Sequence, residues 1–454
     1  MTPMTQKNQR RPHRVEFPLP STPDVWDLPL KLTILAALAA LFFFSIRAQI
    51  FSPLFRLAAA HGISATLAWP SILWFAMGTL LLVFRTLLWF TYRPHPVATS
   101  ENAPRMTVVI PAYNEGAMVA HAIDSVADAN YPHERLEIIA VDDGSTDDTW
   151  QHIQLAAARH GGRVRTIRLA HNSGKREALA TGFRLGHGDV FVTVDSDSIV
   201  VPNALLALAG PFALARTGVV AGKVLVYNRR EGIIPRMLYV RFTLAFDFLR
   251  AYQSTFGTVY CSPGALSAYR ASAVKLVLES WVQQRFLGVP ASIGEDRALT
   301  NDIMHLGYDS VYQREAVVLT VVPTTYRQLY RMLLRWNRSY IREELRFSLV
   351  VWKRPPIARL IALVDSTITN LRYPVALLTF VLLGFAFFGD LRVLPRLLVA
   401  IGVISFFYSL YYLRSERSFN MIYGVLYEYF TFFFLFWVFP WALLTVRVRG
   451  WLTR

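Results

Sequence analysis

The chain has 454 residues, of which 54% are hydrophobic and 14% aromatic, and its formal net charge is +16 at pH 7. This length allows one large soluble domain together with membrane spans, and the single cysteine, Cys261, excludes an internal disulfide framework and a thiolate metal cluster. Because the basic residues stand beside apolar runs, we assign the excess charge to anchoring at the cytoplasmic face and to anionic head groups or phosphates, and not to nucleic acid.

The N-terminal region is predicted to anchor the chain in a membrane. Residues 1–28 are polar, basic and proline-bearing, which is typical of disorder. The apolar run that follows has the features of a signal peptide, but a second apolar run comes soon after it, so we interpret the first as an uncleaved anchor. Two spans are therefore predicted near 30–47 and 69–91, within a unit at 29–92. The second contains Arg85, which we expect near the interface or facing protein, since a charge at the bilayer centre is costly.

From 104 to 325 the composition changes to short β-branched runs that alternate with helical stretches. This alternation predicts a parallel or mixed sheet covered by helices. The predicted strands are Met106–Pro111, Leu136–Val141, Val164–Leu169, Val190–Asp195, Val219–Val224 and Val317–Val322.

Two apolar runs, 233–256 and 326–353, are interrupted by charge. They favour helices that lie in the membrane interface over spans, and an ordinary amphipathic surface helix is the alternative. We assign the interfacial unit that carries the second run to 326–368.

The unit at 369–447 returns to membrane character. Its apolar runs approach the roughly 20 residues that cross the hydrocarbon core. They lie near 370–389, 394–413 and 420–446. The basic flanks predict a multi-pass protein of the cell (inner) membrane whose α/β domain is cytoplasmic. Five spans would put the basic tail 448–454 outside, against the positive-inside tendency, so the number of C-terminal spans is left open.

Two carboxylates stand one residue apart where the predicted strand Val190–Asp195 ends. Ligands of open α/β sheets collect where such strands end, and Asp195 and Asp197 would repel each other unless a cation neutralised them. A hard divalent ion that also holds a pyrophosphate is the natural occupant. Two exposed turn aspartates are the alternative.

Polar residues also follow the first two strands. Tyr113 and Glu115 come after the first, where ring stacking and a carboxylate can hold a base or a ribose. After the second, Asp142 and Asp143 precede Ser145 and Asp147 at the start of a helix. One of these residues is expected to cap the helix, which leaves Asp142 or Asp143 to bind a nucleotide.

Three further motifs each have an ordinary structural alternative. Lys175 begins a helix and can hold phosphate, although the motif is short of a complete phosphate loop. Asp296, after Glu295, could accept a proton from an incoming hydroxyl or serve as a helix N-cap acid. Arg335 and Trp336 offer paired donors for phosphate and a flat face for a sugar ring, or belong to an interfacial aromatic belt.

Together, and in this order inside a membrane-flanked α/β domain, the motifs resemble the family 2 membrane glycosyltransferases, which include hyaluronan, chitin, cellulose and rhizobial chitooligosaccharide synthases. The resemblance covers about 105–345 in detail. Residues 335–343 and 451–454 look especially like the hyaluronan and chitooligosaccharide branch. In one departure, Met332 occupies the Gln position of the family pattern Gln-x-x-Arg-Trp, which leaves processivity and polymer identity open.

The resemblance implies a GT-A fold, a Rossmann-like sheet that binds a UDP-sugar with Mg²⁺ or Mn²⁺, inserted between N- and C-terminal transmembrane helices. It implies roles for the motif residues as follows: Tyr113, Glu115 and Asp143 hold the uridine with Asp142 and Lys175 nearby, Asp195 faces the ribose and diphosphate, Asp197 ligates the metal, Asp296 is the catalytic base, and Arg335, Trp336, Glu295, Cys261 and Gly264 lie on the diphosphate and acceptor side. For Cys261, a buried free thiol beside a turn is the alternative.

The implied activity is inverting transfer of a sugar, N-acetylglucosamine in our interpretation, from a UDP-sugar to a growing β-linked glycan that is exported. The expected partners are the donor, the glycan and membrane lipids. Transfer to a lipid-linked acceptor, another UDP-hexose donor, and a nucleotide-binding transporter or scaffold without turnover are the alternatives. Arg85, Asp365 and Asn370 would line the export path or pack helices together. The sequence leaves the oligomeric state open.

Overall fold

The computed structural model describes residues 52–59, 63–389 and 393–448, together with isolated positions 36, 40 and 43. The predictions for 1–28 and for the tail beyond residue 448 lie outside the described residues, as does the first span near 30–47 apart from those isolated positions.

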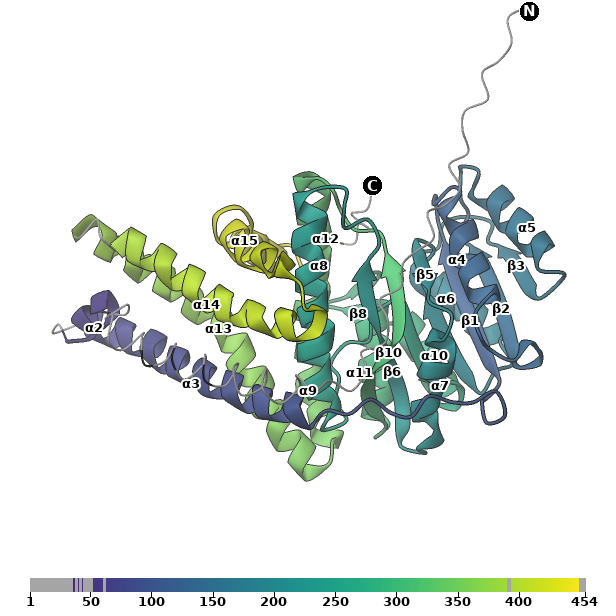
Figure 1. The fold of residues 1–454 in the computed structure, drawn as a ribbon, viewed down its shortest axis with the longest axis horizontal. Coiled ribbons are helices and arrows are strands. Elements are labelled where there is room, and N and C mark those ends of the chain that lie inside the picture. Colours follow the sequence, from purple (N-terminus) through teal and green to yellow (C-terminus); the bar gives the residue numbers. More distant parts are fainter. Residues whose placement is uncertain are drawn as a thin grey trace, which may run out of the picture.

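An eight-stranded mixed sheet forms the centre of the α/β domain (Figure 1). The strands, in chain order, are β1 (Met106–Ala112), β2 (Leu136–Asp142), β3 (Val164–Arg168), β4 (Val190–Val194), β5 (Ser198–Val200), β6 (Thr217–Val226), β7 (Leu266–Arg270) and β10 (Asp309–Thr320). They lie in the order β3-β2-β1-β4-β7-β6-β10-β5. β1 is parallel to β2 and β4, whereas β7 is antiparallel to both of its neighbours, β4 and β6. The prediction of a parallel or mixed sheet is confirmed as a mixed sheet.

Helices cover both faces of this sheet, and side chains alternate between two cores. Within β1, Val108 and Ile110 belong to one core and Val109 to the other, as the two-residue period of a strand requires. The covering helices are α4 (Met118–Ala127), α5 (Thr149–Arg159), α6 (Lys175–Leu185), α7 (Ala204–Ala209), α10 (Ala271–Val282) and α11 (Glu295–His305). A two-stranded hairpin, β8 (Arg285–Phe286) and β9 (Val289–Pro290), precedes α11.

Two long elements stand between this domain and the remaining helices (Figure 1). They are α8 (Ile233–Leu244), which continues through a π-helical turn at Ala245–Arg250 into α9 (Ala251–Ser254), and α12 (Tyr326–Val350). Most of α8 is buried, because β6 lies on one side of it and the later helices on the other. Both runs are helices, and their placement in a membrane interface stays a prediction.

The remaining helices extend away from the sheet (Figure 1). They are α2 (Ser52–Ala59), α3 (Ile63–Thr91), α13 (Pro356–Gly389), α14 (Val393–Glu416), α15 (Ile422–Phe430) and α16 (Val438–Leu444). Among the described residues, Leu397–Glu416 is long and apolar enough to cross a membrane, and Phe419–Leu435 with Val438–Leu444, bent by 49°, would make a second span if the pair is one. The multi-pass arrangement therefore stays a prediction.

Candidate active site

A single cavity of about 1490 Å³ collects most of the predicted site residues. It opens at the carboxyl ends of β1, β2 and β4, passes the start of α11 and the middle of α12, and reaches polar side chains of α3, α13, α14 and α15. All of the predicted site residues except Asp142 line it.

The loops after β1 and β2 hold each other through short polar contacts. Asn114, with φ of 53°, donates its backbone N–H to Ser145 Oγ at 3.0 Å. Glu115 donates its backbone N–H to Thr149 Oγ1 at 2.8 Å. These contacts place the Tyr113 ring, 42% exposed, and the Glu115 side chain on the cavity wall. The wall therefore presents an aromatic face and a carboxylate, as the sequence predicts for a nucleoside.

The two aspartates after β2 take different positions. Asp142 is fully buried, accepts the Ser145 N–H at 3.0 Å and pairs with Arg168 at 3.1 Å. It braces the turn, so the expected contact with a nucleotide does not fit its position. Asp143 lines the cavity and accepts the backbone N–H groups of Ser173 and Gly174, each at 2.8 Å. Burial raises the pKa of Asp143, and these two donors oppose that rise.

Another aspartate of this acidic cluster lies just before the start of α5. Asp147 Oδ1 accepts the backbone N–H of Thr149, the first residue of α5, at 3.0 Å. The N-cap residue of α5 is Asp148, whose side chain makes no capping hydrogen bond, so Asp147 contacts the start of the helix from the position before the N-cap.

Lys175 joins the donor side of the cavity to α11. Its ammonium lies 2.5 Å from Asp195 Oδ1 and 2.9 Å from Glu295 Oε1. Burial alone would lower the pKa of Lys175, but the two carboxylates outweigh it and hold the pKa well above its ordinary value. The same pairing lowers the pKa of Glu295 in spite of its burial. Lys175 is thus a fixed cation between two anions.

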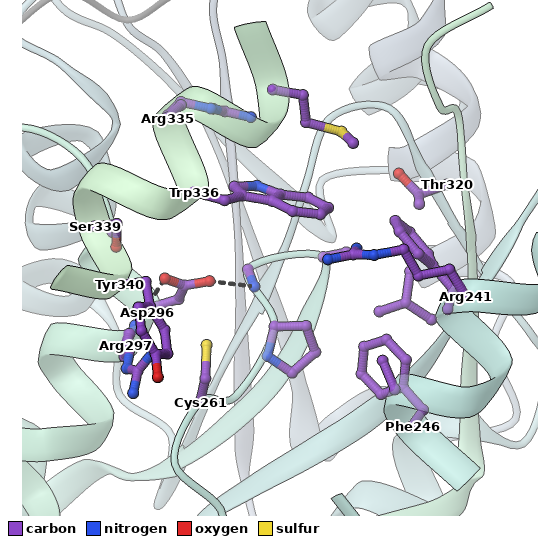
Figure 2. Close-up of a pocket in the computed structure, with 18 of the residues that line it drawn as sticks. Arg241, Phe246, Cys261, Asp296, Arg297, Thr320, Arg335, Trp336, Ser339 and Tyr340 are labelled. Carbon is purple, nitrogen blue, oxygen red and sulfur yellow. Dashed lines mark hydrogen bonds between the residues drawn. The ribbon is translucent and has the colours of Figure 1, made fainter. Parts of the chain in front are cut away.

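Asp296 follows Glu295 directly, but its pKa is raised, whereas that of Glu295 is lowered. Burial, and then the charge of Glu295, raise its pKa to about 6. Its Oδ2 accepts the backbone N–H of Gly264 at 3.1 Å and its Oδ1 that of Arg297 at 2.7 Å (Figure 2). A carboxylate with a pKa near neutrality in a cavity is suited to general base catalysis.

The turn before α11 requires a glycine. Gly294 has φ of +73°, and a Cβ there would overlap the Ser339 hydroxyl of α12. This close approach sets α12 against the beginning of α11, which brings Arg335 and Trp336 over Asp296 (Figure 2). Burial lowers the pKa of Arg335, and the nearby carboxylates, Glu295 first, oppose this change.

One stripe of α12 faces the cavity. Met332, Trp336, Tyr340 and Glu344 all line it at four-residue spacing, which places them on one side of a helix. Met332 thus contributes a thioether to the wall at the position where the family pattern has an amide.

Cys261 and Gly264 lie on the facing loop. The Cys261 side chain is half-buried beside Asp296 (Figure 2), and burial raises the pKa of its thiol to about 12. The thiol is therefore protonated at neutral pH and unreactive. A Cβ at Gly264 would lie 2.9 Å from the Lys175 ammonium. The glycine therefore allows its loop to approach the Lys175 triad, which consists of Lys175, Asp195 and Glu295.

The oxygen-bearing side chains beside the strand end suit a hard divalent ion that is also bound by a diphosphate. Asp195 and Asp197 both line the cavity, and Thr320 Oγ1 donates to Asp197 Oδ1 at 3.2 Å. Among the described residues no group of three or more His, Cys, Asp or Glu side chains could hold a metal on its own. Mg²⁺ commonly binds one or two carboxylates and takes its other ligands from phosphate and water, which these two residues permit.

The charged side chains of the cavity wall that were not predicted are Arg241, Arg250, Arg297, Glu344, Arg372 and Glu428. For Glu344 the four-residue spacing after Trp336 is a usable signal, and Arg297 follows directly after Asp296. Arg241 carries no local signal, because α8 reaches the cavity only through its packing between β6 and the helices α14 and α15.

The polar residues Arg85, Asp365 and Asn370 make buried contacts between helices. Arg85 Nε donates to Asp365 Oδ1 at 2.7 Å. Asn370 accepts from Tyr340 at 2.5 Å. Arg85 and Asp365 also line the cavity, so helix packing and cavity lining are combined in this pair.

Comparisons with known proteins find a family match within the α/β domain. Residues 107–278 match the family described as glycosyl transferase family 2. The chain is 36% identical over 269 residues to hyaluronan synthase of Streptococcus pyogenes, covering 58% of this chain and 63% of the relative. It is 34% identical over 254 residues to an N-acetylglucosaminyltransferase of Sinorhizobium fredii, covering 55% and 60%. The match therefore spans less than two thirds of either relative.

A solved structure supports the fold. The mannosyltransferase PcManGT from Pyrobaculum calidifontis, in complex with GDP-Man and Mn²⁺, has a TM-score of 0.60 at 20% identity and covers 80% of this chain and 99% of its own. The α/β domain has the GT-A, Rossmann-like fold that the sequence resemblance implied. Residues 107–278 of this chain form a glycosyl transferase family 2 domain.

Proposed function

We propose that the protein is a membrane-embedded, inverting glycosyltransferase that moves a sugar, N-acetylglucosamine in our assignment, from a UDP-sugar to a growing β-linked glycan and exports the product. The observation that carries this proposal is the continuity of the cavity. The same space is lined by the loops at the strand ends, by Asp296, and by polar side chains of the helices that extend from the domain.

In this proposal the strand-end loops hold the donor. Tyr113, Glu115 and Asp143 bind the uridine, the last also holding the Ser173–Gly174 loop in place. Asp195 faces the ribose and diphosphate, and Asp197 would hold Mg²⁺ or Mn²⁺, which when bound supplies Lewis-acid stabilisation of the departing diphosphate. Arg335 adds a cation on the same side.

Asp296 then accepts the proton of the acceptor hydroxyl as that oxygen attacks the anomeric carbon and the bond to UDP breaks. One displacement of this kind inverts the anomeric centre. The Gly264 and Arg297 N–H groups orient the Asp296 carboxylate. The Trp336 ring gives the acceptor sugar an apolar face. A hydrolase, in contrast, uses a carboxylate pair and water as acceptor.

Export is supported by the polar wall beyond the acceptor position. It includes Arg85, Asp365, Thr369 and Ser405, which lie on helices that we assign to the membrane, with the α/β domain on the cytoplasmic side. A glycan in transit needs such hydroxyl and charged partners, because its own hydroxyls would otherwise be buried without hydrogen bonds.

A donor panel tests the proposal. Purified full-length protein in detergent is incubated with UDP-N-acetylglucosamine, UDP-glucose, UDP-glucuronate and GDP-mannose, and UDP or GDP release and product length are measured. UDP release with a lengthening product supports the proposal. Release with a single sugar per lipid would favour a lipid-linked acceptor, and binding without release would overturn the enzymatic assignment in favour of a scaffold or transporter.

A further inference from the structure

An arginine of α8, Arg241, projects into the cavity beside the acceptor tryptophan. Its guanidinium carbon lies 5.6 Å from the ring centroid of Trp336 on α12 and 5.6 Å from that of Tyr427 on α15. Figure 2 shows the side chain reaching toward the space under Trp336, on the far side from Asp296. Two aromatic rings from two other helices thus fix the position of one cation.

The hydrogen-bond donors of Arg241 have no hydrogen-bond or ion-pair partner among the residues that the structure describes. Three other arginines of the cavity have partners within the protein. Arg85 pairs with Asp365 at 2.7 Å, Arg297 pairs with Glu344, and Arg250 donates to the carbonyl of Cys261 at 3.0 Å. Each of these charges is used within the protein, whereas that of Arg241 is available to a ligand.

The nearest acidic side chain does not use this charge. Glu428 follows Tyr427 on α15 and also lines the cavity. It interacts electrostatically with Arg241 and with Arg372, but no ion pair within 4 Å forms with either. One carboxylate therefore faces two guanidinium groups, and this part of the wall keeps a positive excess.

We propose that Arg241 is a specificity-determining residue that binds a carboxylate on the acceptor glycan, so that the product contains an acidic sugar. This inference rests on the proposed function and specifies its substrate class. Contacts with two rings restrict the position of the Arg241 guanidinium, and its planar donors match the two oxygens of a carboxylate. A sugar stacked on Trp336 would bring a carboxylate of its own or of the adjoining residue to these donors. Neutral hydroxyls would gain less, because they cannot accept two parallel charge-assisted bonds.

The test compares two acceptor oligosaccharides of equal length. One is the tetrasaccharide of β-linked N-acetylglucosamine, and the other alternates N-acetylglucosamine with glucuronate. Binding to the purified full chain, in the presence of UDP, is measured by calorimetry. The wild type is expected to bind the acidic tetrasaccharide at least about tenfold more tightly, the size expected for a charged hydrogen bond. R241Q should lose that preference and keep its affinity for the neutral tetrasaccharide within about twofold.

Arg236 provides a matched control. It lies on the same helix, stacks on Tyr423 at 5.5 Å and donates to the Tyr423 hydroxyl at 2.7 Å, but it does not line the cavity. R236Q should retain the full preference for the acidic tetrasaccharide. R241K, which keeps the charge without the planar fork, should fall between the wild type and R241Q. Unchanged UDP affinity shows that each variant is folded.

Two results would overturn the inference. One is equal affinity of the wild type for both tetrasaccharides, and the other is an equal loss of both affinities in R241Q, which would mean that Arg241 only orients Trp336. UDP release by the same wild-type preparation tests the proposed function separately. A protein that distinguishes the two glycans but never releases UDP would refute the transferase and not the carboxylate site.

Discussion

Replacing Asp296 with asparagine tests the proposed base directly. At pH 7, one unit above a pKa of about 6, about nine tenths of the Asp296 side chains carry the charge that accepts a proton. Asparagine keeps the size of the side chain and an oxygen that can accept the Gly264 N–H, but it has no basicity. General base catalysis contributes about 10²- to 10⁴-fold. D296N should therefore lower kcat by at least about 10²-fold and leave the affinity for UDP within about twofold.

The substitution is not expected to unfold the protein. The pKa of Asp296 rises from 3.8 to about 6, so ionising this buried group costs about 3 kcal/mol relative to the unfolded chain. Because the folded-state pKa is the higher one, the stability that the neutral group contributes is present below pH 3.8 and is lost as the pH rises to about 6. Asparagine never carries the charge, so the melting temperature of D296N at pH 7 should not fall.

The pH profile provides the second half of this test. With the required carboxylate ionising near pH 6, kcat/KM of the wild type should decrease about tenfold between pH 7.5 and pH 5, measured by UDP release. Asp302 offers a control on the same helix, where it pairs with Arg346 at 2.5 Å outside the cavity. D302N should retain transfer. Near wild-type transfer by D296N, or a flat profile across this range, would refute Asp296 as the base.

Three further substitutions separate the other roles. D197A should weaken UDP binding in Mg²⁺ or Mn²⁺ and abolish its dependence on the metal in calorimetry; undiminished dependence would exclude Asp197 as a ligand. K175M leaves the buried Glu295 and the half-buried Asp195 without their cation, a loss of about 3 kcal/mol, the low end for breaking a buried ion pair. It should lower the denaturation midpoint, and an unchanged midpoint would contradict the role of Lys175 as the shared partner of these two carboxylates. W336A should raise KM for the glycan acceptor more than W336F, with donor binding unchanged, and equal effects of the two would argue against stacking.

Strands with a run of β-branched and apolar residues could be predicted, and strands without such a run could not. β1, β4 and β6 are buried along their whole length, so each is rich in β-branched and apolar residues, although β6 also contains Lys223, which pairs with Asp247 at 2.7 Å. β7 contains Ser267 and Ala268, which lack the bulk of a typical strand residue and are kept in place by antiparallel pairing with β4. The prediction for β10 began at Val317, eight residues late, because Arg314 and Glu315 interrupt the run where the ladder has an irregularity.

In the candidate site, some residues stand out in short sequence motifs, whereas others reach the cavity only through the packing of distant helices. Asp195, Asp197 and Asp296 come directly after a strand or at the start of a helix, where the sequence predicts ligand contacts, and the structure brings all three to one cavity. Their chemical roles stay predictions. The Lys175 triad and the position of Arg241 depend on how α6, α8 and α11 pack, and no short pattern encodes that packing. Asp142 shows the converse: its motif position suggested a ligand contact, and its pairing with Arg168 makes it part of the turn.

The Lys175 triad connects the two halves of the proposed reaction. Lys175 contacts Asp195, beside the diphosphate position, and Glu295, whose charge helps to raise the pKa of Asp296. When UDP departs, negative charge grows on the Asp195 side, and when the acceptor is deprotonated, the charge on Asp296 is neutralised. One change adds negative charge near Lys175 and the other removes it. The electrostatic field at the Lys175 ammonium therefore changes less when both occur together than when either occurs alone. In the proposed reaction, such a site would favour transfer over cleavage of the donor without an acceptor.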